Sequence, residues 1–357
     1  MWFASPGKAG LVARIIHQLS LNENCSPPLP GVVEALSGAL DQVHLTLDAL
    51  ADGLAADLAG RLGLDAGRVV AGAGSGALLQ QFLTAHAGAG TTVVHTWPSF
   101  EMYPLLIRNA LAEPVAVTGP DDRQDLAAVA AAVTPDTSVV LLCNPNNPTG
   151  EVLDAARLRD LLDALPPHVL VLVDEAYREF AAPDAIADAV ELHRTDDRVA
   201  VVRTFSKSHG LLGLRVGYLV GAAEVVAPVR RTTPFYRVPT IAQAAAVAAL
   251  KAEPEMREQC ERVAAERDRV RSGLLDLGFD VPPSGGNFLW LRLGARNREF
   301  VEHLAEDGIA VRALAGGSGV RVSTGIPEAN DAVLRAAGRF AAGLAAARTT
   351  PASTDHR

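Results

Sequence analysis

The chain has 357 residues, of which 49% are hydrophobic, and this is more than one ordinary core requires. Its formal net charge of −9 argues against a nucleic acid or an anionic membrane surface as partner, because both bind basic surfaces. The three cysteines are far apart and lack metal-ligand spacing, and no apolar run reaches the ~18 residues that span a bilayer. We therefore expect a cytoplasmic protein without a metal site, whose anionic ligands are bound by local arginines.

The first predicted unit is an N-terminal arm, residues 1–31, because the polar turn-rich stretch 22–28 cannot continue a helix. Residues 32–64 carry apolar side chains at helical spacing and predict two helices. Apolar strands then alternate with Ala- and Leu-rich helical segments, which indicates an α/β fold with a mainly parallel sheet between helices. The seven predicted strands are 68–71, 91–95, 114–117, 138–142, 169–173, 199–202 and 217–220.

The pattern changes beyond residue 240, where helices are predicted at 242–250 and 254–277. Strands are expected at 287–292, 309–312 and 320–323, followed by a final helix from about Glu328. The sequence therefore predicts a large domain over 32–250 and a small α+β domain over 251–347. The polar tail 348–357 is expected to be disordered.

Lys207 follows the predicted strand 199–202, at the position where a central strand delivers residues to a cleft. Desolvation there lowers the pKa of an ammonium and makes the free amine a nucleophile that can form a Schiff base with an aldehyde. Arg215 and Ser206 supply a cationic fork and a hydroxyl for a phosphate. A solvated surface lysine on a Gly-rich loop is the competing interpretation.

Two further turns follow predicted strands. Gly74, Ser75 and Gly76 join a strand to an apolar helix, whose free N–H groups and positive dipole end suit an anion. An ordinary flexible turn would explain this motif equally. Asn147 lies between two prolines in the turn 143–150, so its amide is rigidly held and can donate to an oxygen, although an Asx/Pro turn is the alternative.

Asp174 ends a run of four apolar residues, where a carboxylate is costly unless it meets a cation or a strong donor such as a protonated heteroaromatic nitrogen. A helix-capping aspartate is the alternative. Tyr177 can reach the same ligand, and Phe100 can stack on a planar ring or simply pack in the core.

Three polar residues stand in the predicted small domain. Arg312 and Arg321 lie in short β-branched strands, where burial demands an anionic partner, either a ligand carboxylate or a structural ion pair. Asn287 lies at a strand start after a Gly-Gly pair. Together with the lysine, the carboxylate and the phosphate-binding groups described above, these residues suit pyridoxal 5'-phosphate and an amino acid.

The motifs occur in a characteristic order: Gly74-Ser75, Asn144-Pro145-Asn146-Asn147-Pro148-Thr149-Gly150, Asp174-Glu175-Ala176-Tyr177, and Ser206-Lys207 through Gly213-Leu214-Arg215. In this order the chain resembles class I/II aminotransferases of the fold type I pyridoxal-phosphate superfamily, within them the histidinol-phosphate aminotransferase group. The segment Trp97-Pro98-Ser99-Phe100-Glu101-Met102-Tyr103 is most similar to the aromatic aminotransferase branch. The resemblance extends from about residue 21 to 340.

The resemblance implies a role for each residue. Lys207 would form the Schiff base and move the proton. Asp174 would hold the pyridine nitrogen protonated, Asn147 and Tyr177 would bond the phenolic oxygen, and Phe100 would stack on the ring. Arg321, helped by Asn287, would bind the substrate α-carboxylate, with Arg312 near the substrate side chain or its phosphate. A homodimer with its active site at the interface is also implied.

The chain departs from the family pattern at Thr46, where relatives usually carry a tyrosine that reaches the partner subunit's cofactor phosphate, and at His209, where an aromatic residue is usual. We expect an aminotransferase that moves an amino group between an aromatic or related amino acid and a 2-oxo acid. These departures motivate an alternative, a pyridoxal-phosphate-dependent lyase or bond-forming enzyme. A cofactor-sensing domain of a transcriptional regulator is disfavoured, because only about 30 residues precede the core.

Overall fold

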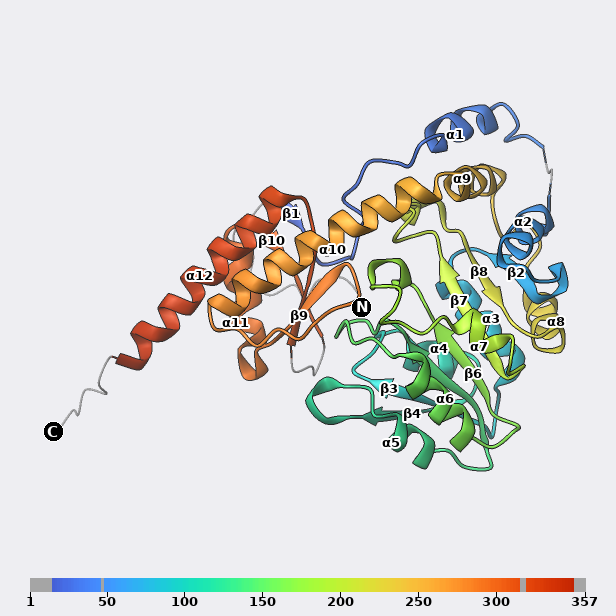
Figure 1. Ribbon diagram of the computed structural model, residues 1–357, viewed down its shortest axis with the longest axis horizontal. Helices are drawn as coiled ribbons and strands as arrows, with labels where there is room; N and C mark the ends of the chain where they lie inside the picture. The colour runs from blue at the N-terminus through green and yellow to red at the C-terminus, as the bar shows by residue number, and fades with distance from the viewer. Residues whose placement is uncertain (1–14, 46–47, 315–318, 350–357) are drawn as a thin grey trace.

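Seven strands form one sheet in the order β2-β8-β7-β6-β5-β3-β4 (Figure 1). The computed structural model describes residues 15–45, 48–314 and 319–349. Neighbouring strands from β7 to β4 are parallel, and β8 pairs antiparallel with both β7 and β2. The predicted mainly parallel α/β sheet is thus confirmed. The strands are β2 (Val69–Gly72), β3 (Thr92–Trp97), β4 (Glu113–Thr118), β5 (Thr137–Cys143), β6 (Leu170–Asp174), β7 (Val199–Thr204) and β8 (Gly217–Val220).

Both faces of this sheet are buried under helices, which is why its strands read as continuous apolar runs. Along β2, Val69 and Ala71 pack into the core on one face and Val70 into the core on the other. One face is covered by α3 (Ser75–His86), α4 (Tyr103–Asn109) and α8 (Ala223–Thr232). The other is covered by α2 (Asp52–Leu62), α5 (Leu126–Ala131), α6 (Ala155–Ala164), α7 (Ala189–His193) and α9 (Thr240–Lys251), with α1 (Val32–Leu40) outside α9.

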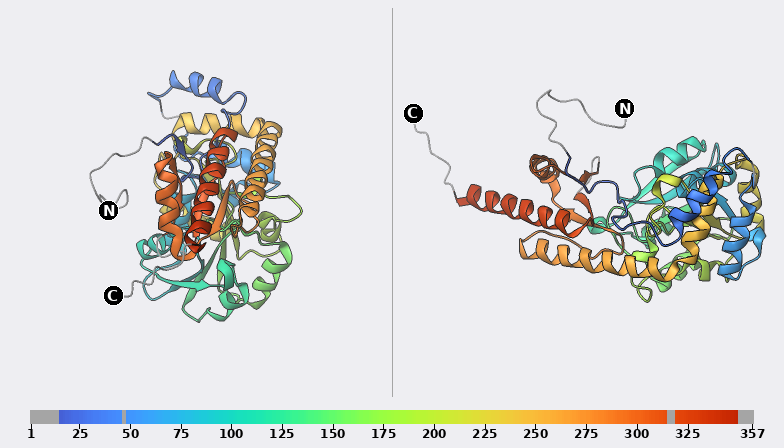
Figure 2. Two further views of the ribbon diagram at one scale, coloured as in Figure 1. Left: turned by 90° about the vertical axis from the view of Figure 1, so that its left-hand side faces the viewer. Right: turned by 90° about the horizontal axis from the view of Figure 1, so that it is seen from above.

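A smaller antiparallel sheet has the order β11-β12-β9 and packs against the last two helices of the described chain and against the helix that connects the two sheets. Phe300 is fully buried in its core and makes edge-to-face contacts with Phe279 and Phe340. Figure 2 shows the last helix lying beside the helix that connects the two sheets. The elements are β9 (Phe288–Arg292), β11 (Arg312–Ala313), β12 (Gly319–Ser323), α11 (Asn297–Glu306) and α12 (Pro327–Thr349).

Two details of the C-terminal part differ from the sequence-based expectation. The strand predicted at 309–312 is divided, because the chain changes its pairing partner at Val311, whose side chain is buried in the small core. Before this residue, β10 (Ile309–Ala310) pairs with an N-terminal strand, and after it β11 pairs with β12. Arg348 and Thr349 belong to α12 and not to a disordered tail, and residues 350–357 lie outside the described residues.

The helix α10 (Glu253–Asp276) connects the two sheets and belongs to both cores. Met256 and Val263 pack with the seven-stranded sheet, whereas Val270 and Leu274 pack in the small core. Its 24 residues span about 36 Å at 1.5 Å per residue. None of the described helices has the length and hydropathy that a membrane crossing requires.

The N-terminal strand β1 (His17–Gln18) runs parallel to β10, and these two strands form a separate sheet that ties the start of the described chain to its C-terminal part. Leu19 then enters the small core, and residues 20–24, called the covering segment below, pass over the loop that carries Lys207. Within the covering segment, Asn22 has a left-handed backbone with φ 52°, a conformation that asparagine tolerates better than most residues.

Candidate active site

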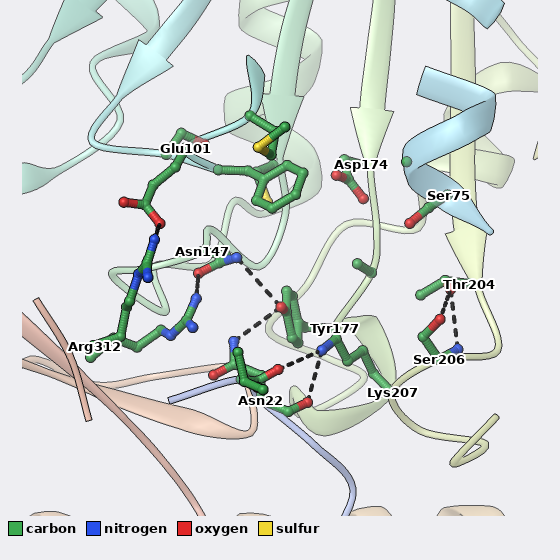
Figure 3. A pocket seen from close by; sticks show the side chains of 18 of the residues that line it. Asn22, Ser75, Glu101, Asn147, Asp174, Tyr177, Thr204, Ser206, Lys207 and Arg312 are labelled. Atoms are coloured by element: carbon green, nitrogen blue, oxygen red, sulfur yellow. Dashed lines mark hydrogen bonds and ion pairs between the residues drawn. The ribbon is translucent and has the colours of Figure 1, made fainter. Parts of the chain in front are cut away.

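A cavity of about 670 Å³ lies between the carboxyl ends of the central strands on one side and the small sheet and the covering segment on the other (Figure 3). This is where open α/β sheets bind their ligands, because the strand ends leave a crevice there. Most of the residues singled out from the sequence line this cavity. They are Ser75, Gly76, Phe100, Asn147, Asp174, Tyr177, Ser206, Lys207, Arg215, Arg312 and Arg321.

Lys207 lies in the loop after β7, and its ammonium is largely withdrawn from solvent. Its Nζ donates to the carbonyl oxygens of Leu21 (3.1 Å) and Asn22 (2.8 Å). Burial, reinforced by the nearby Arg321 guanidinium, lowers the pKa of Lys207 to about 7. A substantial fraction is therefore the free amine at neutral pH, and the alternative of a solvated surface lysine is wrong.

Asp174 is the last residue of β6, and its two carboxylate oxygens differ in their contacts. Oδ2 accepts a hydrogen bond of 3.0 Å from the hydroxyl of Tyr103, whereas the buried Oδ1 has no partner among the described residues. Burial raises the pKa of Asp174 to about 6. Since the helical turn that follows is capped by Tyr177, Asp174 is not the helix cap that the sequence left open.

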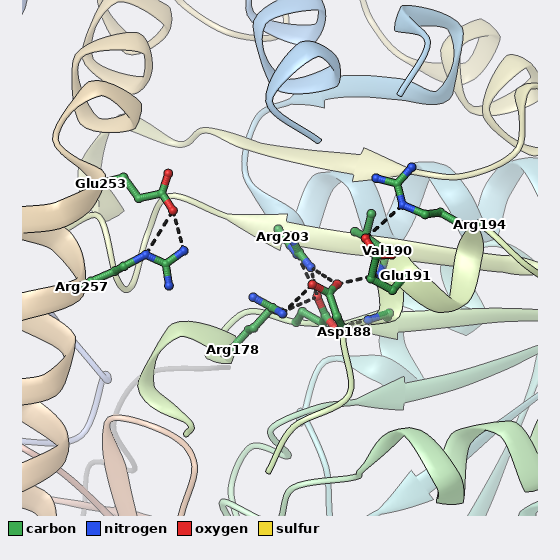
Figure 4. Close-up of polar contacts among 10 residues, drawn as sticks. Arg178, Asp188, Val190, Glu191, Arg194, Arg203, Glu253 and Arg257 are labelled. Carbon is green, nitrogen blue, oxygen red and sulfur yellow. Dashed lines mark hydrogen bonds and ion pairs between the residues drawn. The ribbon is translucent and has the colours of Figure 1, made fainter. Parts of the chain in front are cut away.

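The adjacent Glu175 is committed to a buried ion-pair cluster and does not line the cavity. Its carboxylate lies 2.7 Å from a guanidinium nitrogen of Arg203, which also pairs with Asp188 at 2.9 Å. Arg178 completes this cluster through Asp188 (Figure 4). Of the two consecutive carboxylates, only Asp174 is therefore free to receive a proton donor from a ligand.

A phenol and an amide meet beside Lys207. The hydroxyl of Tyr177 accepts hydrogen bonds from Nδ2 of Asn22 (3.0 Å) and Nδ2 of Asn147 (3.4 Å). Burial raises the pKa of Tyr177 to about 12, so it stays a neutral phenol. The oxygen of the Asn147 amide accepts in turn from Arg321 at 2.6 Å, which links the phenol to the guanidinium.

Arg321 is buried without an acidic partner in the described part of the chain. Besides Asn147, it donates to the carbonyl oxygen of Ser20 at 2.6 Å, and its Nε has no partner there. Burial lowers its pKa. A buried guanidinium without a carboxylate is a ready site for a ligand carboxylate, because its fork geometry accepts one in two-point fashion.

Arg312 behaves differently, because it forms an ion pair of 2.9 Å with Glu101 at the cavity wall. Figure 3 shows the two side chains meeting on the side of the cavity away from Ser75. The sequence left either a ligand carboxylate or a structural ion pair as the partner of each arginine. The structural ion pair applies to Arg312 and not to Arg321.

The opposite end of the cavity is built for an anion. Gly74 has φ 85°, and a Cβ at this position would lie 2.7 Å from a guanidinium nitrogen of Arg215, so only glycine fits. The start of α3 presents free N–H groups there. Ser206 Oγ accepts from Arg215 (3.3 Å) and from Thr204 (2.9 Å).

Several residues named from the sequence lie elsewhere or contribute indirectly. Asn287 does not line the cavity; it donates at 3.3 Å to the carbonyl oxygens of Asn22 and Glu23 and so fixes the covering segment. His209 packs on Phe205 with ring centroids 4.7 Å apart and is not a lining residue either. Thr46 lies outside the described residues.

Three residues at the site were not assigned a role from the sequence. Tyr103 begins α4, and a buried tyrosine needs a hydroxyl partner, which is the signal that could have pointed to it. Asn22 was visible only as part of a polar turn. Glu101 stood in a quoted motif without an assigned contact.

The chain matches the model of the family "Aminotransferase class I and II" over residues 14–337. It is 47% identical to an aromatic amino acid aminotransferase of Thermobifida fusca, over 90% of this chain and 89% of the relative. The corresponding enzyme of Streptomyces avermitilis is 42% identical over 94% of each chain. A histidinol-phosphate aminotransferase of Sinorhizobium meliloti, solved with pyridoxal 5'-phosphate, superimposes with a TM-score of 0.86 at 29% identity, covering 93% of this chain and 92% of that one.

The chain therefore belongs to the class I and II aminotransferase family, with the fold of the type I pyridoxal-phosphate enzymes. It is a pyridoxal-phosphate-dependent aminotransferase. The resemblance stated from the sequence motifs is confirmed, and the lyase alternative is not favoured.

Proposed function

We propose that this aminotransferase moves an amino group from an aromatic amino acid to a 2-oxo acid. The carrying observation is the contrast between Arg321 and Arg312 of the cavity wall: Arg321 forms no ion pair with an acidic side chain of the described residues, whereas Arg312 is already paired with Glu101. The wall thus offers the Arg321 guanidinium for an α-carboxylate and, around the paired Arg312, a neutralised, partly apolar region for a side chain. The printed names of the relatives, aromatic amino acid aminotransferases, support the same donor.

We infer the cofactor-binding role of each residue from its position in the cavity wall and, for Asp174, from its unpartnered oxygen. The unpartnered Oδ1 of Asp174 suits the protonated ring nitrogen of pyridoxal phosphate. The start of α3 with Ser75 and Gly76, together with Ser206 and Arg215, suits its phosphate. Asn147 and Tyr177 suit a ring oxygen, Phe100 lines the cavity and suits stacking on the ring, and Lys207 would supply the amine for the aldehyde.

Bound pyridoxal phosphate supplies an electron sink for the electrons of the bond broken at the substrate Cα. The protein's contribution is to hold charges and move a proton. Asp174 stays ionised beside the positively charged ring nitrogen and so keeps that nitrogen protonated. Lys207, whose pKa of about 7 gives both protonation states near neutrality, accepts the Cα proton and later returns one. Arg321 fixes the α-carboxylate, and therefore the orientation of the Cα–H bond.

We further propose a cytoplasmic homodimer. Its support is a group of exposed apolar side chains on neighbouring segments, Val33 and Leu40 of α1 together with Phe235 and Tyr236. The backbone N–H of Tyr236 donates to Ala49 O, and α1 packs on α9, which begins at Thr240, a few residues after Tyr236. In sedimentation, Phe235→Asp should shift a dimer towards monomer, whereas Leu111→Asp, at an isolated exposed leucine, should not. A wild-type monomer at micromolar concentration would contradict the proposal.

The direct test of the function uses the holoenzyme with phenylalanine, tyrosine, aspartate and histidinol phosphate in separate single-turnover reactions. We expect conversion of the bound cofactor to pyridoxamine phosphate, with release of the 2-oxo acid, to be fastest with an aromatic donor. Preference for histidinol phosphate would overturn the proposed substrate class. Fragmentation or decarboxylation of the donor without pyridoxamine phosphate would instead support a lyase.

A further inference from the structure

The pair Glu101–Arg312 has a geometry that bears on substrate choice. Arg312 on β11 is the direct cross-strand partner of Arg321 on β12. The two arginine side chains are therefore attached at paired positions of the small sheet. Like charges directly opposite each other on a sheet repel. Accordingly, the Arg312 charge contributes to the lowered pKa of Arg321, whereas Glu101 acts in the opposite sense.

Glu101 comes from a distant part of the chain, 211 residues before Arg312 and on the loop that precedes α4. One of its oxygens, Oε2, accepts from both Nη2 (2.9 Å) and Nε (3.2 Å) of the arginine. Both side chains line the cavity, and both are partly exposed, at 27% for Glu101 and 45% for Arg312. A ligand can therefore reach the pair.

Lys207, Arg215 and Arg321, the other cations of the cavity wall, form no ion pair with an acidic side chain in the described ranges. Among these cations of the cavity wall, Arg312 is thus the one whose charge is neutralised by an acidic side chain. A second acidic group on a substrate, carried on its side chain, would have to displace Glu101 from Arg312 and would meet the Glu101 carboxylate at close range. An uncharged side chain meets no such opposition.

We propose that Glu101 is a specificity-determining residue, which masks Arg312 and so selects substrates with uncharged side chains over substrates with a second anionic group. This inference deepens the proposed function and rests on it for the identity of the favoured side chain. The contrast it predicts, one anion against two, can nevertheless be measured without turnover.

The test is calorimetric binding of two unreactive acids to the pyridoxal-phosphate holoenzyme. Glutarate carries two carboxylates, 3-phenylpropanoate carries one carboxylate and an aromatic ring, and neither has an amino group. In Glu101→Gln, the ratio of the glutarate to the 3-phenylpropanoate association constant should rise by about fivefold, the factor expected when a partly exposed ion pair no longer competes. The double variant Glu101→Gln/Arg312→Gln should lose this gain.

A matched control is Glu302→Gln, because Glu302 forms an exposed ion pair of 2.7 Å with Arg298 on α11, away from the cavity. This variant should leave the ratio unchanged. A ratio that stays constant in Glu101→Gln, or a gain that persists without Arg312, would overturn the inference. Failure of the proposed function has a different signature: wild-type enzyme without activity on aromatic donors, whatever the variants do to the binding ratio.

Discussion

Tyr103 donates a hydrogen bond of 3.0 Å to Oδ2 of Asp174 and leaves Oδ1 without a protein partner among the described residues. This contact joins the first residue of α4 to the last residue of β6. The hydroxyl lowers the pKa of the carboxyl group, against the larger opposite effect of burial. Tyr103 therefore both orients the carboxylate and helps to keep it ionised.

Tyr103→Phe should consequently weaken cofactor binding at the acid side. Because the pKa of Asp174 rises when the hydroxyl is lost, the carboxylate is protonated at a higher pH. We expect the affinity of the apoenzyme for pyridoxal phosphate to fall by about tenfold at pH 6, as for the loss of a hydrogen bond to a charged group, and by less at pH 8. Fluorescence titration across pH 5 to 8 measures this, and an equal loss at every pH would contradict the assigned role.

Asp174→Asn should separate stability from activity. The folded pKa of about 6 exceeds the ordinary 3.8, so the folded apoenzyme binds more protons between these values and loses stability as the pH rises through them. Removing the charge should stabilise the apoenzyme at pH 7.5, by at most about 3 kcal/mol, with little gain near pH 4. Activity should be abolished.

Thermal unfolding of both apoproteins at the two pH values tests this, with Asp197→Asn as a control at an exposed carboxylate. A destabilised Asp174→Asn apoenzyme at pH 7.5 would show that the carboxylate is needed for folding rather than for the ligand.

Lys207 should react with the aldehyde in its neutral form. Its folded pKa of about 7 lies below the ordinary 10.5, so the reactive fraction rises as the pH passes from 6 to 8. We expect the rate of pyridoxal phosphate capture by the apoenzyme to follow the same titration. Borohydride reduction and peptide mapping should locate the label on Lys207, and the exposed Lys251 serves as the internal control. A rate that rises only above pH 9 would contradict the lowered pKa.

Arg321→Gln should impair substrates through their α-carboxylate. Loss of a charge-assisted two-point contact is expected to lower kcat/KM for phenylalanine by about 100-fold. The association of 3-phenylpropanoate should fall similarly, whereas cofactor content should be retained. The control is Arg298→Gln, on the exposed face of α11. Unaltered binding of the acid would move the carboxylate site elsewhere.

Asn22→Gly should test the covering segment without straining it, because glycine accepts the φ of 52° at this position. The variant keeps the carbonyl that accepts from Lys207 but loses the side-chain contacts to Tyr177 and Ser323. We expect kcat/KM to fall by about tenfold with little change in the unfolding temperature. Unchanged kinetics would show that the backbone of the segment suffices.

The seven strands could be predicted because each carries a short β-branched apolar run, and the cavity could be placed because strand ends of such sheets share one edge. Lys207, Asp174 and Asn147 follow directly from that rule. The contacts that could not be predicted join distant positions. Glu101 finds Arg312 across 211 residues and Asn22 finds Lys207 across 185 residues, and no local pattern encodes either pairing.

The division of the strand at Val311 was unpredictable for a related reason. Residues 309–312 look uniform in sequence. They form two strands only because β10 pairs with β1 whereas β11 pairs with β12. That break carries Arg312 to a register position opposite Arg321. A feature of tertiary pairing thus decides which charges meet in the cavity.

The single helix α10 has a consequence for how the chain can be divided. Because Met256 and Val263 stabilise one core while Val270 and Leu274 stabilise the other, cutting the chain on either side of this helix leaves one half with an unfilled apolar groove. Arg267 adds a second link, donating to the carbonyl oxygens of Phe180 (3.1 Å) and Gly286 (3.0 Å). Neither half should therefore be obtainable as a stable fragment, and the chain should melt in one transition.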